Sequence, residues 1–218
     1  MKYYEPYIPC EHMPVVQAIK ANWRRIRGEC DSMFHRTSLD LKPNWELEKN
    51  RNRLPTEDNE TMYRGENYSA HIRIVEELLV PKEIEVTSTA NSIHWRNVKA
   101  EMNPTIMGIL QPHIDAGNVG NIGFNRLMPG ARIAPHYGVS TKYFRVHLGL
   151  HVDSLAQFFI EGGPPYTWEE GKIMAFADGH WLHWVEHNGT KQRTIMAVDF
   201  KKEMLGPEVM ALIPDKPI

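Results

Sequence analysis

Two histidines and an arginine in the second half of the chain have the types and spacing to bind a metal and a carboxylate. His136 lies between Pro135 and Gly138, and His183 precedes Arg193 by ten residues. Neutral imidazoles bind divalent metals, and a guanidinium can hold a carboxylate through two parallel hydrogen bonds. A metal site beside a carboxylate site suggests an iron centre that takes a keto acid as cosubstrate.

Two further histidines, His180 and His187, compete with His183 for the second ligand position. A histidine in a strand is more often a hydrogen-bonded structural residue than a ligand. His136 stands out because it follows a Pro-Gly turn and precedes a glycine, which would place it at the mouth of a β-sandwich. His183 stands out because tryptophans flank it and could form a dry wall. His180 and His187 remain alternatives, because spacing alone does not exclude them.

A second histidine motif has a simpler explanation. His113 and Asp115 match the His-x-Asp half of a 2-His-1-carboxylate facial triad. They close a helical stretch, whereas such a pair should lie at a strand end that faces a barrel interior. We therefore expect a helix C-terminus, where Asp115 and Gly117 form the turn.

Arg193 begins an apolar stretch that is typical of a strand. Alternation puts Arg193, Ile195, Ala197 and Asp199 on one face. Arg193 is either a surface residue, a partner of Asp199, or an inward residue that grips a carboxylate. A buried arginine needs such a partner, since an unpaired buried charge is costly.

Composition bounds the class of protein. The chain has 218 residues, 42% hydrophobic and 24% charged, with a net charge of -2. These values suit one globular domain and give no electrostatic reason to expect nucleic acid or an anionic membrane as partner. Cys10 and Cys30 form no disulfide framework, and the first residues resemble no secretory signal. We expect a cytoplasmic protein without a membrane span.

The patterns predict a helical N-terminal part and a β-rich C-terminal part. A helix is expected over 13–35, a long polar loop or lid over 36–69, and two helical pieces over 93–116, broken at Pro104. Residues 70–80 fit a helix or a strand. From residue 120 onward, short apolar runs alternate with turn residues, which predicts the strands 122–128, 143–152, 157–160, 172–177, 181–186 and 193–200.

Between residues 121 and 200 the chain resembles the aspartyl/asparaginyl β-hydroxylase family of Fe(II)/2-oxoglutarate oxygenases. The motifs are Leu-Met-Pro-Gly at 127–130, Pro-His-x-Gly at 135–138, Arg-x-His-Leu-Gly-Leu at 145–150, Thr-Trp-Glu-Glu-Gly-Lys at 167–172, Phe-x-Asp at 176–178, and His183 with Arg193. Their order and spacing match the family, apart from one extra residue between Phe176 and His183. Together they form a specific signature.

The resemblance implies a fold and a set of roles. The fold would be a double-stranded β-helix, a cupin-like jelly roll, within one domain: a helical and loop part over 1–119, the β core over 120–202 and a tail over 203–218. His136 and His183 would bind iron, with Gly138 where other oxygenases have a carboxylate ligand. Arg193 would clamp 2-oxoglutarate, and the residues beside this cosubstrate would be Asn125, Arg145 and His147.

The resemblance also implies a reaction. It would be hydroxylation of an unactivated C–H bond with Fe(II), 2-oxoglutarate and O₂, giving succinate and CO₂. The substrate would be amino-acid-like, either a small molecule or a peptide of the Asp/Asn type. Arg126, Arg132 and Lys142 either hold a substrate carboxylate or are solvated. The alternatives are a halogenase that uses the vacancy at Gly138 and a non-catalytic cupin-like metal-binding protein.

Overall fold

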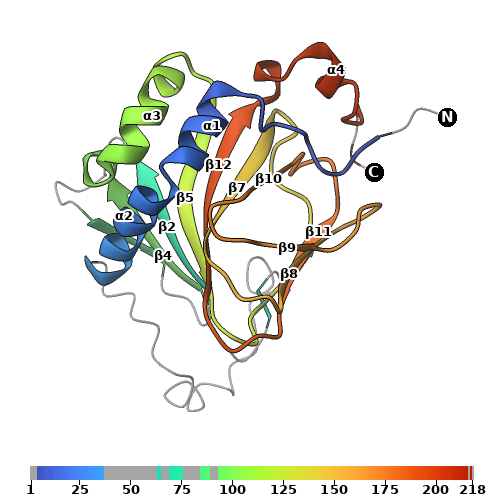
Figure 1. Ribbon diagram of the computed structural model, residues 1–218. Coiled ribbons are helices and arrows are strands. Elements are labelled where there is room, and N and C mark those ends of the chain that lie inside the picture. Colours follow the sequence, from blue (N-terminus) through green and yellow to red (C-terminus); the bar gives the residue numbers. More distant parts are fainter. Residues whose placement is uncertain are drawn as a thin grey trace.

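Two β-sheets face each other, and three helices cover the outer side of the larger sheet (Figure 1). This computed structural model describes residues 4–36, 63–64, 69–75, 84–88, 93–215 and 217. The predicted lid over 36–69 lies almost wholly outside the described residues. Within this range the structure describes only residue 36, residue 69 and the pair 63–64.

The larger sheet has seven strands, antiparallel except where β2 runs parallel to β4. Its order is β10 (Ile173–Phe176), β7 (Tyr143–His151), β12 (Arg193–Lys201), β5 (Val119–Leu127), β2 (Ser69–Val75), β4 (Ile93–Lys99) and β3 (Ile84–Ser88). The smaller sheet has the order β1 (Tyr63–Arg64), β6 (Arg132–His136), β11 (His183–His187), β8 (Ala156–Ile160) and β9 (Tyr166–Thr167).

From β5 to β12 the chain passes back and forth between the sheets. β5, β7, β10 and β12 lie in the larger sheet, and β6, β8, β9 and β11 lie in the smaller one. Two facing sheets wound in this way form a jelly roll, the double-stranded β-helix. The fold predicted from the resemblance is therefore confirmed.

The central strands of the larger sheet are buried on both faces. In β12 every residue except Ala197 and Lys201 is buried, and β7 is continuously buried from Val146 to Leu150. One face packs under the helices and the other faces the smaller sheet. This explains why these segments are nearly continuous apolar runs rather than alternating ones.

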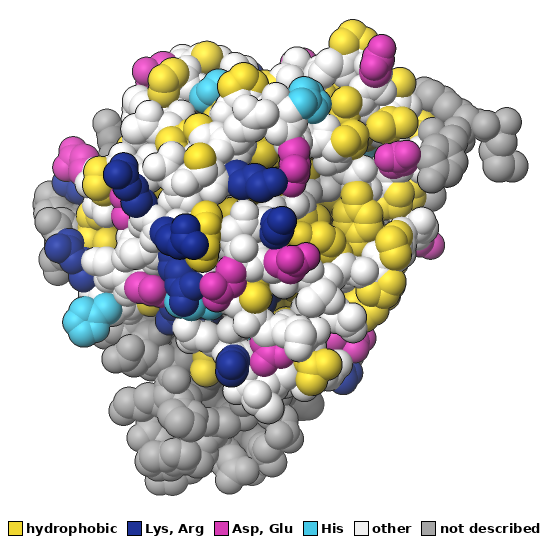
Figure 2. Space-filling model, viewed as in Figure 1, with side chains coloured by type: hydrophobic (Ala, Val, Ile, Leu, Met, Phe, Trp, Pro, Cys, Tyr) yellow, Lys and Arg dark blue, Asp and Glu magenta, His cyan; other side chains and the backbone are white. Residues whose placement is uncertain are grey.

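The N-terminal helices differ from the single predicted helix. α1 (Pro14–Ala21) and α2 (Trp23–Arg36) are separated at Asn22, whose side chain donates a hydrogen bond to the Ala18 carbonyl at 2.9 Å. An asparagine that bonds the backbone in this way competes with the helical hydrogen bonds and ends the helix. The first turns of α2 carry Arg24, Arg25 and Arg27, and Arg27 pairs with Glu170 at 2.8 Å. Figure 2 shows basic and acidic side chains interspersed over this side of the molecule.

The prediction of helix over 93–116 is wrong for its first part. Residues Ile93–Lys99 form β4, followed by the short helix η3 (Ala100–Met102) and by α3 (Pro104–Asp115). Pro104 starts α3 rather than breaking it, because proline suits the first turn of a helix. The Glu29 carboxylate of α2 accepts the Thr105 N–H at 2.6 Å and so caps α3.

The β core begins earlier in the chain than the predicted residue 120. β2 and β4 join the larger sheet beside β5, so residues 69–75 and 93–99 belong to it. The six predicted C-terminal strands are confirmed within three residues at each end, whereas β6 and β9 were missed. The tail holds η4 (Lys202–Met204) and α4 (Pro207–Met210). Among the described residues no helix has the length and apolar character to cross a membrane.

Candidate active site

His136 faces the interior because β6 carries a bulge. His136 pairs with His183, and Ile133 pairs with Val185, so three steps along β6 match two along β11. In a regular strand, residues three apart point to opposite faces, but here both Ile133 and His136 line the cavity between the sheets. Pro135 lies within this bulge, where the absence of an N–H costs no ladder bond. Bulges often re-aim a side chain beside a functional site.

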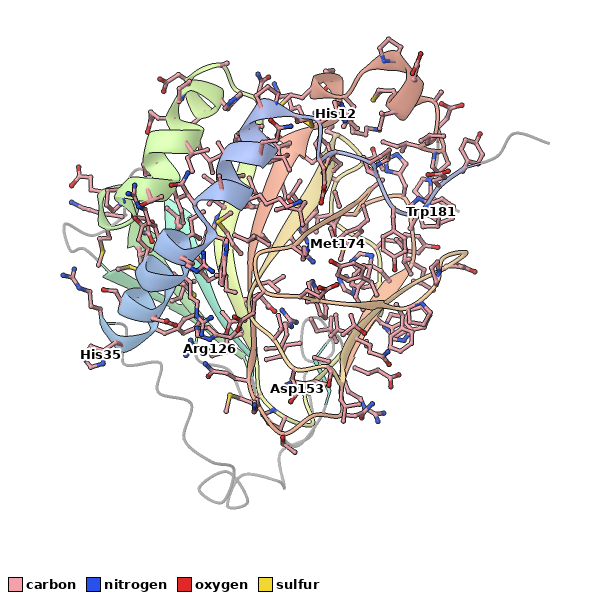
Figure 3. The ribbon with its side chains drawn as sticks, in the orientation of Figure 1. His12, His35, Arg126, Asp153, Met174 and Trp181 are labelled. Carbon is pink, nitrogen blue, oxygen red and sulfur yellow. The ribbon has the colours of Figure 1, made fainter. Side chains whose placement is uncertain are left out.

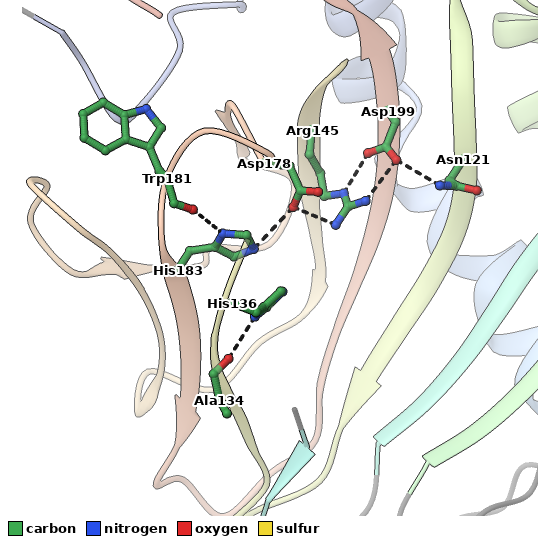
Figure 4. A network of polar contacts seen from close by, with 8 residues as sticks. All are labelled: Asn121, Ala134, His136, Arg145, Asp178, Trp181, His183 and Asp199. Carbon is green, nitrogen blue, oxygen red and sulfur yellow. Dashed lines mark hydrogen bonds and ion pairs between the residues drawn. The ribbon is translucent and has the colours of Figure 1, made fainter. Parts of the chain in front are cut away.

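The two imidazoles lie side by side. Their ring centroids are 4.2 Å apart. His136 Nδ1 bonds the Ala134 carbonyl and His183 Nδ1 bonds the Trp181 carbonyl, each at 2.9 Å (Figure 4). A carbonyl only accepts, so each Nδ1 carries a proton, and each Nε2 faces away from the backbone. Burial and the neighbouring His183 lower the pKa of His136 to about 4. A neutral ring whose Nδ1–H is bound by a backbone carbonyl, as in His136, is the form in which histidine binds a metal through Nε2.

Asp178 fills the space beside Gly138. A Cβ at residue 138 would lie 1.7 Å from Asp178 Oδ2, and the Gly138 N–H bonds the Asp178 carbonyl at 2.8 Å. The Asp178 carboxylate also lies 3.3 Å from His183 Nε2. Burial opposes its ionisation, but Arg145 and His183 outweigh burial and lower the pKa of Asp178 to about 2. The Asp178 carboxylate, on the loop before β11, therefore occupies the space that a side chain at position 138 would need.

Arg145 links two carboxylates beside the histidine pair. Its Nη1 donates to Asp178 at 2.9 Å, while Nε and Nη2 donate to the two oxygens of Asp199 at 2.7 and 2.9 Å (Figure 4). Asn121 adds a hydrogen bond to Asp199 at 3.2 Å. The structure thus places Arg145 in the cavity wall, with its guanidinium engaged by two carboxylates. This geometry favours a positioning role for Arg145.

Arg193 lies farther along the cavity wall. It is 1% exposed, and its Nη1 donates to Asn125 Oδ1 at 2.6 Å. Its guanidinium carbon lies 4.6 Å from the centre of the Trp168 ring, a cation–π contact. Arg193, Ile195, Ala197 and Asp199 all line the cavity, which confirms the predicted alternation. The alternatives of a surface residue and of an Arg193–Asp199 pair are wrong, because Arg193 is buried and Asp199 is bound by Arg145.

His147 lies on β7, between the histidine pair and Arg193. It is 7% exposed and packs among aromatic rings, with Phe176 at 5.3 Å and Trp168 at 6.1 Å between centroids. Burial, followed by Arg145 and Arg193, lowers the pKa of His147 well below its usual value. The ring is therefore a neutral polar group in the cavity wall.

Both sheets contribute to one cavity of about 320 Å³. The predicted residues that meet in its lining are Asn125, His136, Arg145, His147, His183 and Arg193. The apolar lining includes Ile122, Phe124, Ile133, Phe158, Trp168, Phe176 and Val185. A mostly apolar cavity with convergent polar groups is the usual form of a small-molecule site.

The rival histidines lie elsewhere. His187 is a structural residue, since its Nε2 bonds the Lys191 carbonyl at 2.6 Å and its Nδ1 accepts the Gly189 N–H. His180 is buried against Lys202, with 3.3 Å between Nε2 and Nζ. His113 lies in the last turn of α3, as expected, beside Asp115. None of these residues lines the cavity, and no group of three or more His, Cys, Asp or Glu suited to a metal occurs within the described ranges.

The candidate substrate-binding cations are not in the cavity wall. Arg126 packs over the Phe34 ring at 3.6 Å and donates to Thr194, on the side of the sheet that α2 covers (Figure 3). Arg132 and Lys142 are exposed. Arg73 does line the cavity, although the sequence analysis did not single it out as a candidate.

Sequence reasoning assigned no role to Asp178 and considered Asp199 only as a partner of Arg193. Both are acidic residues inside buried, largely apolar stretches. A buried carboxylate requires a partner, and this requirement was the available signal.

A family model described as aspartyl/asparaginyl beta-hydroxylase matches residues 20–203. The chain belongs to the aspartyl/asparaginyl β-hydroxylase family. The family predicted from the motifs is thereby confirmed.

Individual relatives share only part of their length with the chain. It is 35% identical over 107 residues to aspartate beta-hydroxylase domain-containing protein 1 of Mus musculus, covering 47% of this chain and 29% of the relative. It is 30% identical over 95 residues to aspartyl/asparaginyl beta-hydroxylase of Mus musculus, covering 44% and 13%. A solved 2OG-Fe(II) oxygenase family oxidoreductase from Burkholderia pseudomallei is 16% identical, covering 46% of this chain and 57% of that one, with a TM-score of 0.37.

Proposed function

We propose that this protein is an Fe(II)/2-oxoglutarate-dependent hydroxylase. The observation that carries the proposal is the pair His136 and His183, whose Nδ1 atoms are fixed by backbone carbonyls so that both Nε2 atoms remain for a metal. Membership of a hydroxylase family supports the same reaction class.

The residues present fit a bound cation. His183 Nε2 and Asp178 Oδ1 lie 3.3 Å apart, and both are acceptors if Nδ1 of His183 carries the proton. Two acceptors at this distance repel, and the Arg145 guanidinium, 2.9 Å from the same carboxylate oxygen, offsets part of this repulsion. A divalent metal on the two imidazoles would add positive charge on the His183 side, and Fe(II) accepts imidazole ligands.

The other end of the cavity suits the cosubstrate. Arg193 is a buried cation with Asn125 orienting one of its nitrogens, which is the arrangement for bidentate binding of the distal carboxylate. Neutral His147 lies between Arg193 and the histidine pair and can hydrogen-bond the bound molecule without adding charge. When bound, Fe(II) and 2-oxoglutarate supply, with O₂, the oxidation of a substrate C–H bond to an alcohol, with succinate and CO₂ released.

Asp178 and Arg145 shape the metal-binding end. Arg145 holds Asp178 ionised in the space that Gly138 leaves open. A chloride there would meet this carboxylate, so the geometry does not favour the halogenase alternative. The aromatic lining, including Phe158, Phe176 and Trp168, keeps water from the site and strengthens the electrostatic contacts inside it.

The experiment is succinate formation by the purified protein with Fe(II), 2-oxoglutarate and O₂. It is measured alone and with pooled amino acids or peptides that contain Asp or Asn. We expect stimulation by one pool, and slow uncoupled turnover without substrate that is lost in His136→Ala.

The non-catalytic alternative makes the opposite prediction. If wild-type protein binds Fe(II) but neither binds 2-oxoglutarate under anaerobic conditions nor forms succinate, the cavity is a metal-binding site without oxygenase turnover. Anaerobic titration of 2-oxoglutarate, followed by its visible charge-transfer absorbance with Fe(II), separates the two readings before any substrate is known.

A further inference from the structure

Arg73 is an arginine of the cavity wall that the proposed reaction does not yet use. Arg73 lies on β2 opposite Gly123 of β5, while its neighbours Ile72 and Ile74 are 1% and 6% exposed. Alternation therefore points Arg73 away from the face that the helices cover and toward the smaller sheet. Its side chain is exposed and lines the cavity.

The residues of the larger sheet that lie between Arg73 and the interior of the cavity have small side chains. Across the larger sheet, Arg73 pairs with Gly123, Gly123 with Ala197, and Ala197 with His147. Opposed residues share a face, so two small residues separate Arg73 from His147. Gly123 is required there, because a Cβ would lie 2.3 Å from the Ile72 carbonyl oxygen. A molecule can thus lie over Gly123 and Ala197 and reach from Arg73 toward the histidines.

The other charged residues of the cavity lining already have assigned partners, so Arg73 is available to bind a second anion. Three arginines and one aspartate line the cavity. Arg145 binds Asp178 and Asp199, and Arg193 is assigned to the distal carboxylate of 2-oxoglutarate. Arg73 has no ion pair with any carboxylate in the part of the chain that the structure describes.

We infer that Arg73 binds a carboxylate of the primary substrate, so that the enzyme selects acids over the corresponding amides. This inference rests on the proposed function. The carboxylate belongs either to an acidic side chain or to the α-carboxylate of a free amino acid. Both sources present the same planar anion, which a guanidinium holds through two hydrogen bonds.

Two matched pairs of probes test the inference and separate these sources. N-acetyl-aspartyl amide and N-acetyl-asparaginyl amide differ only in the side-chain carboxylate. L-Asparagine and L-asparagine amide differ only in the α-carboxylate. Each is titrated by anaerobic calorimetry into full-length protein saturated with Fe(II) and 2-oxoglutarate, so that binding is read independently of turnover.

We expect the acid of one pair to bind about 10- to 100-fold more tightly than its amide, as is typical of a charge-assisted contact. Arg73→Gln should abolish this preference and Arg73→Lys should retain part of it. Arg132→Gln, at an exposed arginine outside the cavity lining, should leave it unchanged. Affinities for Fe(II) and 2-oxoglutarate should be the same in all four proteins.

Three results would overturn the inference: no preference for the acid in either pair, no binding of any probe, or a preference that survives in Arg73→Gln. Circular dichroism of Arg73→Gln shows whether the variant is folded, and Arg73→Lys provides a second, milder change. Failure of wild-type protein to bind 2-oxoglutarate would instead refute the proposed function, and this is measured before any probe is added.

Discussion

The two sheets contribute to the cavity in different ways. The larger sheet supplies Asn125, His147 and Arg193 by alternation along β5, β7 and β12. β12 pairs with β5 in register from Arg193 to Val198, although its pairing with β7 shifts between Thr194 and Ile195. The smaller sheet supplies His136 and His183, and it needs a bulge in β6 to put both imidazoles on one face. The residues proposed to bind the carboxylate are therefore placed by strand periodicity, whereas the proposed metal ligands come together through one irregular residue in β6.

Removing a ligand from the smaller sheet should have the largest effect. We expect His183→Ala to weaken Fe(II) binding by about 100-fold or more, since loss of outer-shell partners alone costs roughly 10- to 100-fold. Calorimetry under anaerobic conditions measures it. His180→Ala and His187→Ala are the controls and should retain metal affinity. If either control loses it while His183→Ala does not, the ligand pair is wrongly assigned.

The matching change in the larger sheet should separate cosubstrate from metal. We expect Arg193→Ala to weaken 2-oxoglutarate binding by about 100-fold, because two charge-assisted hydrogen bonds are lost. Fe(II) affinity should change little, since Arg193 lies away from the histidines. Both affinities are obtained from anaerobic titrations. Unchanged 2-oxoglutarate affinity would remove Arg193 from the carboxylate site.

Gly138 tests how tightly the metal-binding end is packed. We expect Gly138→Ala to lower the free energy of unfolding by about 2 kcal/mol, because its Cβ would collide with the Asp178 carboxylate and backbone. Urea unfolding measures the change. Gly108→Ala is the control, because a Cβ there meets nothing within 4 Å. Alanine in the interior of α3 should be neutral or stabilising.

A double-mutant cycle sharpens this test. Asp178→Ala removes the nearest of the colliding atoms, so the effects of Gly138→Ala and Asp178→Ala should be non-additive by roughly 1 kcal/mol. Additive effects would mean that Asp178 does not occupy the space beside Gly138.

The smallest effect is expected from His180, which supports the loop before β11. Burial, followed by Lys202, lowers the pKa of His180 to about 4. In the unfolded chain a histidine takes up this proton near pH 6.5, more than two pH units above the folded-state value. The contribution of His180 to stability therefore falls as the pH decreases through this window. His180→Asn should reduce the loss of Tm between about pH 7 and about pH 5. An unchanged pH dependence would contradict a buried neutral His180.

The metal-free protein is the right sample for this comparison. Iron would stabilise the folded state through His136 and His183 and would add its own pH dependence. The Lys202→Met variant provides a second measurement, since removing the nearby cation should bring the pKa of His180 closer to its usual value.

Much of the core was predictable from the sequence alone. The motifs identified the family, and the apolar runs located β5, β7, β8, β10, β11 and β12. Alternation placed Arg193 on the face it shares with Asp199, because side chains in an unbulged strand repeat every two residues. These features depend on local order along the chain.

The remaining features depend on contacts between distant segments. Residues 93–99 became β4 because β2 and β3 pair with them, and tertiary pairing overrides weak local preference. The bulge that turns His136 inward exists only through pairing with β11. Asp178 reaches the space beside Gly138, and Arg73 faces the cavity, only when the sheets and their connecting loops are assembled. The sequence by itself determined which residues could do the chemistry, and the tertiary structure decided which of them meet, because meeting requires long-range pairing that no local pattern encodes.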